Sequence, residues 1–325
     1  MTAAGAAPRF LTTLPYRRRR AWMARADVID PSSVPRRQLV AKLVRAAGRY
    51  EAVVLNGSLR PDQLAAALIA RRRRPPAVVL ADATWKAEAG SFEGRVRRYA
   101  VRGLGHGGAH YCVLSEAEAR LFPATWGVPP ARVHVTPFHW VLDEADVEEV
   151  PPRDGGVFAG GDSLRDYGPL VEAARGLTAE VTIASRTYER TEVPANVRLS
   201  PLDPPSYDEA FRRASVIVVA LEPRGDRSAG QQSYLNAMVL GKPVIVTDSL
   251  GAREYVEHGR TGLVVPPADA RAMHEALDWV LDPANEGEVA ALGERARADA
   301  LARFGPERYV ERLLEVVDRA LAAGD

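Results

Sequence analysis

The sequence contains almost no cysteine and no long apolar segment, and both absences limit what the protein can be. Cys112 is the single cysteine among 325 residues, so no intrachain disulfide can form and a reducing compartment is expected. Its apolar neighbours predict a buried structural thiol rather than a nucleophile. No apolar run approaches the roughly 18–20 residues of a membrane span, and the N-terminus lacks the apolar core of a signal peptide. We therefore expect a cytoplasmic protein.

Several chemical motifs are also missing. The sequence has neither a Walker loop nor a G-x-G-x-x-G segment following a strand, which argues against kinases and dehydrogenases. Histidine, cysteine and acidic residues show no metal-ligand spacing, so no metal site is expected. The arginines lack interleaved aromatic residues, which disfavours nucleic-acid binding.

Charge is divided unevenly along the chain, although the net charge is only +1. Residues 1–150 contain 23 basic and 14 acidic side chains, whereas the remainder contains 20 and 28. Two four-arginine runs, Arg17–Arg20 and Arg71–Arg74, supply much of the excess. Such a basic half can meet an anionic substrate or membrane surface, or it can be a solvated arginine-rich surface with no partner. Peripheral contact with the inner face of an anionic membrane is one expectation.

Apolar β-branched runs alternate with helical stretches, which is typical of parallel α/β domains. The predicted strands are Ala52–Leu55, Ala77–Leu80, Tyr111–Leu114, Val133–Thr136, Val157–Ala159, Val181–Ala184, Val197–Leu199, Val216–Leu221, Val244–Thr247 and Gly262–Val265. The predicted helices are Asp62–Arg73, Glu93–Leu104, Glu116–Phe122, Asp166–Arg175, Tyr207–Ala214, Gln231–Leu240, Ala270–Leu281 and a pair within Val289–Ala323 broken at Phe304-Gly305-Pro306.

The length suits two domains, each large enough for its own core. We expect two Rossmann-like domains, at 1–145 and 146–305, and a C-terminal helix at 306–325 that returns to the first domain. The acidic stretch 143–154 contains Pro151-Pro152 and is expected to be the linker.

The segment Ser228–Asp248 is the most informative part of the chain. Gly230 removes side-chain bulk where a helix would begin, and Gln231, Gln232 and Ser233 place free backbone N–H groups in its first turn. Unpaired N–H groups and the helix dipole together favour a phosphate at such an end. A tight strand-to-helix connection without a ligand is the alternative interpretation.

This segment resembles the donor half of retaining glycosyltransferases with the GT-B fold, in the large family 4 (glycosyl transferases group 1). Their usual pattern, E-G-x-G-x-x-x-x-E-A-M-A-x-G-x-P-V-V-A-T, has two glutamates, and Ser228 and Asn236 occupy those places here. An amide can donate to and accept from a ribose diol, so Asn236 is a chemically tolerable replacement. Ser228 removes a charge from the region near the donor sugar.

Other parts of the chain extend the resemblance. The turn Gly160-Gly161 and the following Arg165 resemble the first strand and turn of the family's donor domain, where a basic residue contacts the nucleotide diphosphate. The usual arginine after the first glycine is replaced by Gly161. Glu254 occupies the place of the family's Gly-x-x-Glu. The alternatives are that Arg165 pairs with Asp162 or Asp166 and that Glu254 faces solvent.

The resemblance implies a metal-independent hexosyltransferase that uses a nucleotide-diphosphate sugar as co-substrate, needs no other cofactor and retains the anomeric configuration. Arg165 and the amides of Gly230–Ser233 would stabilise the departing diphosphate, and no general base can be named. The acceptor would be a glycan, a lipid-linked compound or a small molecule in polysaccharide or glycoconjugate biosynthesis. The alternative is a non-catalytic sugar-nucleotide-binding or scaffold protein that has lost the acidic pair.

Overall fold

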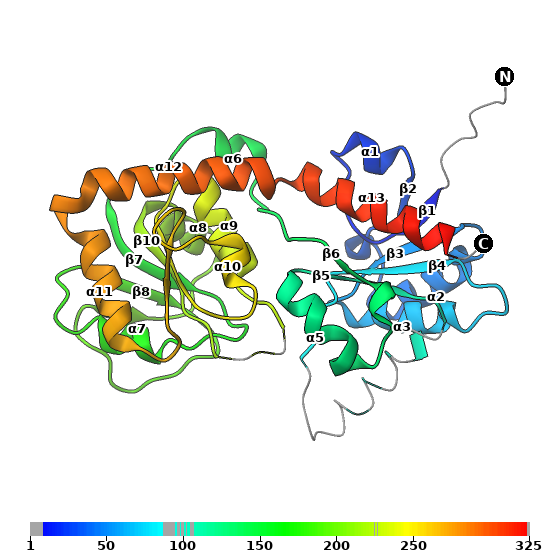
Figure 1. Ribbon diagram of the computed structural model, residues 1–325, viewed down its shortest axis with the longest axis horizontal. Helices are drawn as coiled ribbons and strands as arrows, with labels where there is room; N and C mark the ends of the chain where they lie inside the picture. Colours follow the sequence, from blue (N-terminus) through cyan, green and yellow to red (C-terminus); the bar gives the residue numbers. More distant parts are fainter. Residues whose placement is uncertain are drawn as a thin grey trace. The chain divides into compact units, whose positions relative to one another are not determined.

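The computed structural model describes residues 9–86, 95, 98, 101, 103–104, 107–223, 225 and 227–323, with only the backbone described at 36 and 37. The chain forms two compact units. Unit 1 comprises Met1–Pro137 and Glu307–Asp325, and unit 2 comprises Phe138–Pro306. Each unit is an α/β domain built on its own parallel sheet (Figure 1), which confirms the predicted fold class.

Unit 1 contains a six-stranded parallel sheet in the order β2-β1-β3-β4-β5-β6. Its strands are β1 (Phe10–Thr12), β2 (Ala26–Val28), β3 (Ala52–Asn56), β4 (Ala77–Ala81), β5 (His110–Val113) and β6 (Val133–Val135). Its helices are α1 (Arg20–Met23), η1 (Pro31–Ser33), α2 (Arg36–Ala47), α3 (Arg60–Ala70), α5 (Glu116–Trp126), η2 (Pro130–Arg132) and α13 (Pro306–Ala322). The helix predicted at Glu93–Leu104 falls largely outside the described residues.

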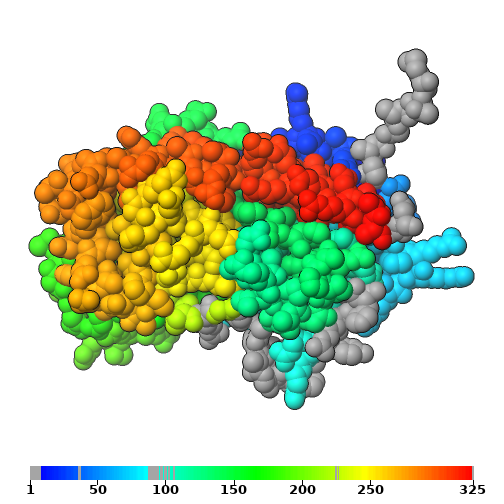
Figure 2. Space-filling model, viewed as in Figure 1, coloured from blue at the N-terminus to red at the C-terminus, as the bar shows by residue number. Residues whose placement is uncertain are grey.

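Helix α13 joins unit 1 although it lies at the other end of the sequence. Arg19 pairs with Glu307, and Arg25 pairs with Asp318 at 2.6 Å. The hydroxyl of the fully buried Tyr309 donates to Asp82 Oδ1 at 2.7 Å. The outer side of α13 is visible in red in Figure 2. These contacts place the C-terminal helix on the first domain, as the resemblance implies.

Unit 2 contains a second six-stranded parallel sheet, in the order β12-β11-β10-β7-β8-β9. Its strands are β7 (Gly155–Gly160), β8 (Val181–Ala184), β9 (Val197–Leu199), β10 (Ala214–Val219), β11 (Val244–Thr247) and β12 (Leu263–Val265). Its helices are α6 (Glu144–Glu148), α7 (Gly168–Ala173), α8 (Pro204–Arg213), α9 (Gln231–Val239), α10 (Ala252–Tyr255), α11 (Ala270–Leu281), η3 (Pro283–Asn285) and α12 (Glu286–Arg303).

Successive residues of the central strands of unit 2 enter different cores. Ile217 and Val219 of β10 pack into one buried cluster, and Val216 and Val218 pack into the cluster on the opposite face. Strand side chains alternate between faces, so a strand covered on both sides must be apolar throughout. This requirement explains why continuous β-branched runs predict the strands of unit 2 so well.

The stretch 143–154, expected to be a linker, instead packs within unit 2. The Val147 side chain is buried and its carbonyl accepts from Arg297 at 2.5 Å. The buried Lys242 donates to the carbonyls of Pro151 and Pro152. These two cations satisfy backbone carbonyls that would otherwise need water, and they fix the stretch to the domain.

Candidate functional site

The candidate site lies at the carboxyl edge of the sheet in unit 2. Strand β7 has β8 on one side and β10 on the other, so the chain order reverses beside β7. Ligands of open α/β sheets bind at such a switch point, outside the carboxyl ends of the strands. The loops after β7 and β10 leave the sheet side by side here, and together with α9, which follows the second loop, they contain most of the residues singled out in the sequence.

The turn after β7 requires glycine at two consecutive positions. A Cβ on Gly160 would clash with the Tyr207 hydroxyl. Gly161 has a backbone φ of +113°, which residues that carry a side chain rarely adopt. The Tyr167 hydroxyl donates to the Gly161 carbonyl at 2.6 Å and fixes the turn. The two glycines therefore let the backbone pass close to the core while leaving the space above it free of side chains.

Arg165 connects this turn to helix α9. Its Nε donates to the Gly160 carbonyl at 3.2 Å, its NH1 to the Ser163 carbonyl at 3.1 Å and its NH2 to Ser233 Oγ at 3.0 Å. The guanidinium is thus fixed at the carboxyl edge, and neutral oxygens accept all three bonds.

The alternative pairing of Arg165 with a neighbouring aspartate does not occur. Asp162 accepts from Ser185 Oγ and from the main chain and side chain of Arg186. Asp166 Oδ1 accepts from the Gly168 N–H at 3.1 Å. No carboxylate within the described ranges pairs with Arg165, so its positive charge is available to an anion.

Helix α9 begins beside this guanidinium. Gly230 is its N-cap with φ of +84°, and no side chain caps the helix. The first N–H groups of a helix have no intrahelical acceptor, and the helix dipole favours negative charge there. Gln231 is buried, and its Nε2 has no hydrogen-bond partner in the part of the chain that the structure describes. Backbone and side-chain donors therefore gather in the first turn, where Gln232 is exposed and Ser233 is half-buried.

The remaining predicted residues lie on the same domain with different surroundings. Ser228 is buried in the loop before α9. Asn236 lies in the second turn of α9 and accepts the Val141 N–H at 2.9 Å through Oδ1, so part of its amide serves the fold. Glu254 lies on α10, half-buried, with its carbonyl bonded to Arg303 at 3.0 Å.

The sequence did not identify three residues that shape this edge. Tyr207 and Tyr167 support the glycine turn, and Arg227 donates through NH2 to Ser163 Oγ at 2.7 Å. Tyr207 gave no signal because it lies on α8, far from the turn in sequence, and Tyr167 follows the turn closely but has no pattern that indicates its bond to Gly161. Arg227 is a basic residue shortly before a glycine helix start, which is a signal that could have indicated it.

Trp85 of unit 1 closes the loop that follows β4. It packs edge-on against Tyr111 and Trp126, and its Nε1 donates to the Gly57 carbonyl at 2.6 Å. Within the described ranges, no three His, Cys, Asp or Glu side chains group as metal ligands would. None of the helices described here is long and apolar enough to cross a membrane.

Two family models match separate parts of the chain. The model described as "Glycosyl transferase 4-like domain" matches residues 1–139, and the model described as "Glycosyl transferases group 1" matches residues 164–283. The second match includes Arg165 and all of α9, and it begins just after the glycine turn Gly160-Gly161.

Curated relatives match shorter stretches. An alpha-1,3/1,6-mannosyltransferase of Neurospora crassa is 32% identical over 85 residues, covering 26% of this chain and 18% of the relative. An exopolysaccharide phosphotransferase of Streptomyces coelicolor is 28% identical over 118 residues, covering 36% of this chain and 12% of the relative. The chain thus aligns with less than a fifth of either protein's length.

Solved structures share the fold over nearly the whole chain. HepE from Anabaena, crystallised with UDP, matches with a TM-score of 0.64 at 18% identity, covering 91% of this chain and 86% of that one. A glycosyltransferase from Rickettsia africae matches with a TM-score of 0.65 at 14% identity, covering 91% and 85%. At these identities the likeness establishes the two-domain architecture alone.

Proposed function

We propose that the chain is a glycosyltransferase of the GT-B fold and that it transfers a hexose from a nucleotide-diphosphate sugar to an acceptor hydroxyl. The observation that carries this proposal is the convergence of Arg165 on the first turn of α9. A cation without a carboxylate partner and a row of free backbone donors meet at the switch point of the sheet. That combination suits a diphosphate.

In this proposal the diphosphate lies over the turn Gly160-Gly161, where no Cβ obstructs its approach. Arg165 and the N–H groups of Gln231, Gln232 and Ser233 bind its oxygens. When the bond between the sugar and the diphosphate breaks, negative charge grows on the departing oxygen. Donors that are already fixed in place stabilise that charge without reorganising. The proposed transfer therefore requires no metal ion, because the chain supplies the positive charge.

The neutral residues at the two positions of the family's glutamates have distinct proposed tasks. Asn236 Oδ1 is occupied by the Val141 N–H, but its Nδ2 can still donate to a ribose hydroxyl. Ser228 and Glu254 flank the donor sugar. Retention of configuration follows from the family resemblance and is part of the proposal. The family matches favour an enzyme over the non-catalytic alternative.

We further propose that the acceptor is a glycan, a lipid-linked compound or a small molecule and that transfer takes place in the cytoplasm. HepE has been crystallised with UDP-glucose, and TarM with UDP and alpha-GlcNAc-glycerol. These relatives support a nucleotide-sugar donor and a hydroxyl acceptor for this chain.

A thermal-shift screen against UDP-, GDP- and ADP-hexoses tests the donor assignment. A ligand that binds only the native state raises the melting temperature, by an amount that grows with its concentration relative to Kd. We expect one nucleotide series to raise the Tm of the wild type and to raise that of Arg165→Ala much less. Equal Tm shifts for both proteins would remove Arg165 from the site.

A further inference from the structure

Unit 1 contains an apolar groove between helices α2 and α3 that the proposed transfer does not use. The two helices lie beside one another (Figure 1). Val40 and Val44 of α2 line a groove of about 810 Å³ together with Leu64 and Leu68 of α3. Both pairs have the i, i+4 spacing that places side chains on one helix face.

The leucines of this groove are unusually exposed. Leu64 is 53% exposed and Leu68 is 43% exposed, and Leu59, just before α3, is 42% exposed. Leaving large aliphatic side chains in water is unfavourable, so several of them within one short stretch indicate a partner.

The surroundings of the groove are strongly basic. Residues 36–74 contain ten arginines and lysines but only two acidic residues, Glu51 and Asp62, and Asp62 is fully buried. Arg45 and Arg60 line the groove itself. Neither forms an ion pair with any residue that the structure describes.

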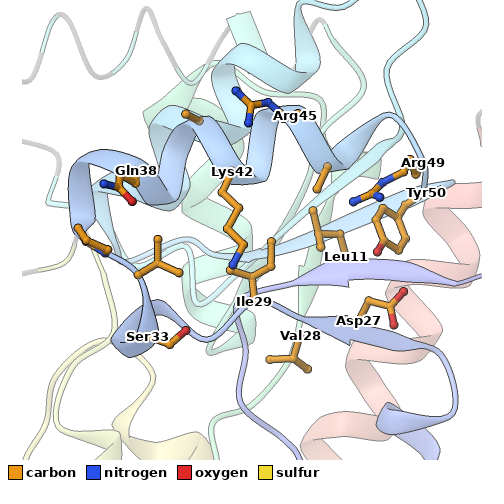
Figure 3. A pocket seen from close by; sticks show the side chains of 14 residues that line it. Leu11, Asp27, Val28, Ile29, Ser33, Gln38, Lys42, Arg45, Arg49 and Tyr50 are labelled. Carbon is orange, nitrogen blue, oxygen red and sulfur yellow. The ribbon is translucent and has the colours of Figure 1, made fainter.

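A second, basic cavity of about 890 Å³ adjoins the groove on the other side of α2. Figure 3 shows Lys42 extending from α2 toward Ile29, while Arg45 extends from the helix in the other direction. Arg49 also lines this cavity. Its single carboxylate, Asp27, pairs with Arg9, and the arginine holds the pKa of that carboxyl below its usual range. The lysine and arginines therefore keep an uncompensated positive charge beside the apolar groove.

We propose that this α2–α3 surface docks unit 1 on an anionic lipid bilayer. The leucines would enter the boundary between headgroups and acyl chains, and the arginines and Lys42 would contact lipid phosphates, as on amphipathic interfacial helices. A second copy of the chain suits the surface poorly, because pairing two such faces would oppose two clusters of like charge. The α2–α3 surface thus assigns membrane contact to particular side chains, where the sequence offered only the charge of the whole first half.

Cosedimentation with vesicles tests the proposal. We expect the full chain to bind phosphatidylcholine vesicles containing phosphatidylglycerol at low salt and to bind pure phosphatidylcholine vesicles weakly. Replacing Arg45 and Arg60 by Gln should lower the partition coefficient about 30-fold, because each of the two charges removed should weaken membrane binding by a similar factor. The matched control replaces Arg198 and Arg271 of unit 2 by Gln and should change binding little.

Neutral leucine variants separate insertion from electrostatic attraction. Leu64→Gln with Leu68→Gln leaves the charge unchanged and should weaken binding at least about tenfold. The control pair Leu121→Gln with Leu301→Gln replaces leucines that are 40% and 46% exposed. Circular dichroism verifies that each variant is folded. Equal binding by the two leucine pairs would overturn the proposal.

A fluorescent probe gives an independent readout. Because Cys112 is buried, Leu64→Cys can be labelled selectively with an environment-sensitive dye, as can Leu301→Cys. Anionic vesicles should shift the emission of the dye at position 64 to the blue and leave that at position 301 unchanged. An unchanged emission of the dye at position 64 would contradict membrane docking. So would a dimer that forms in the absence of vesicles and is lost in the Leu64→Gln, Leu68→Gln variant.

Discussion

The guanidinium of Arg165 donates to the hydroxyl of Ser233 at 3.0 Å, although 68 residues separate them in the sequence. The contact joins the turn after the first strand of unit 2 to the first turn of α9. It holds a cation beside unpaired helix N–H groups before any ligand arrives. Pre-organised donors of this kind bind an anion without first paying for their own ordering.

The first prediction concerns Arg165. Arg165→Ala should weaken UDP or GDP binding by about one to two decades, because a charge-assisted hydrogen bond contributes roughly 1.5–3 kcal/mol. Isothermal calorimetry measures the change, and Arg271→Ala on the exposed face of α11 is the control. Nucleotide affinities that match the wild type would show that the diphosphate binds elsewhere.

Gly230 provides a test of the helix start. Its φ is +84°, and a Cβ there would lie 2.8 Å from Val219 Cγ1. Gly230→Ala should lower the free energy of unfolding by about 1–3 kcal/mol through backbone strain. It should also weaken nucleotide binding.

Gly287 in α12 is a matched control for that substitution. It has open space at its Cβ position, so Gly287→Ala should be neutral or stabilise the protein by up to about 1 kcal/mol. Urea denaturation and calorimetry on both variants give the two readouts. A Gly230→Ala protein with wild-type stability and wild-type affinity would contradict the proposed role of the turn.

Asn236 supports the fold through its bond to Val141, and in the proposed function it also contacts the ribose. Asn236→Ala leaves the Val141 N–H without its acceptor and should cost about 1–3 kcal/mol of stability. Asn236→Asp keeps an acceptor for the Val141 N–H but loses the Nδ2 donor. It should therefore weaken nucleotide binding clearly while lowering the Tm only slightly. If Asn236→Asp binds nucleotide as the wild type does, Asn236 is a structural residue only.

Asp82 predicts a pH dependence of stability. Desolvation raises the pKa of the Asp82 carboxyl from 3.8 to about 6, although the hydrogen bond from Tyr309 acts to lower it. A raised carboxyl pKa favours the neutral form in the folded state, so stability is lost as pH rises from about 4 through 6. Asp82→Asn keeps an acceptor for Tyr309 and suits the φ of +53°.

The Asp82→Asn protein should therefore be about 2 kcal/mol more stable than the wild type at pH 7, with the difference shrinking toward pH 4. Urea denaturation at several pH values measures this difference. Asp278→Asn on the exposed side of α11 is the control. A constant difference across the pH range would show that Asp82 does not titrate as described.

The sequence predicted unit 2 more completely than unit 1, for a physical reason. The central strands of unit 2, β7, β10 and β11, are nearly continuous apolar runs, as a sheet covered on both faces requires. In unit 1, β1 and β2 are three residues each, and β2 includes Asp27. Such short strands are defined by their pairing partners rather than by their own composition. Helix α2, which follows Pro31 and Pro35 and begins with two arginines, was missed as well.

The candidate site shows the same division between local and distant information. Gly230, Gln231 and Arg165 follow local patterns that a single sequence reveals. The Arg165–Ser233 bond and the support of Tyr207 under Gly160 depend on how distant segments pack. The bond between Asn236 and Val141 could not be predicted either, because Val141 belongs to an irregular segment without a pattern.

The release of nucleoside diphosphate from the tightest-binding nucleotide sugar tests the central claim most directly. The wild type should slowly hydrolyse that sugar nucleotide without an acceptor, and Arg165→Ala should do so at least about tenfold more slowly, since we propose that Arg165 stabilises the departing diphosphate. Tight binding of the nucleotide sugar with neither hydrolysis nor transfer to any hydroxyl acceptor would contradict the account.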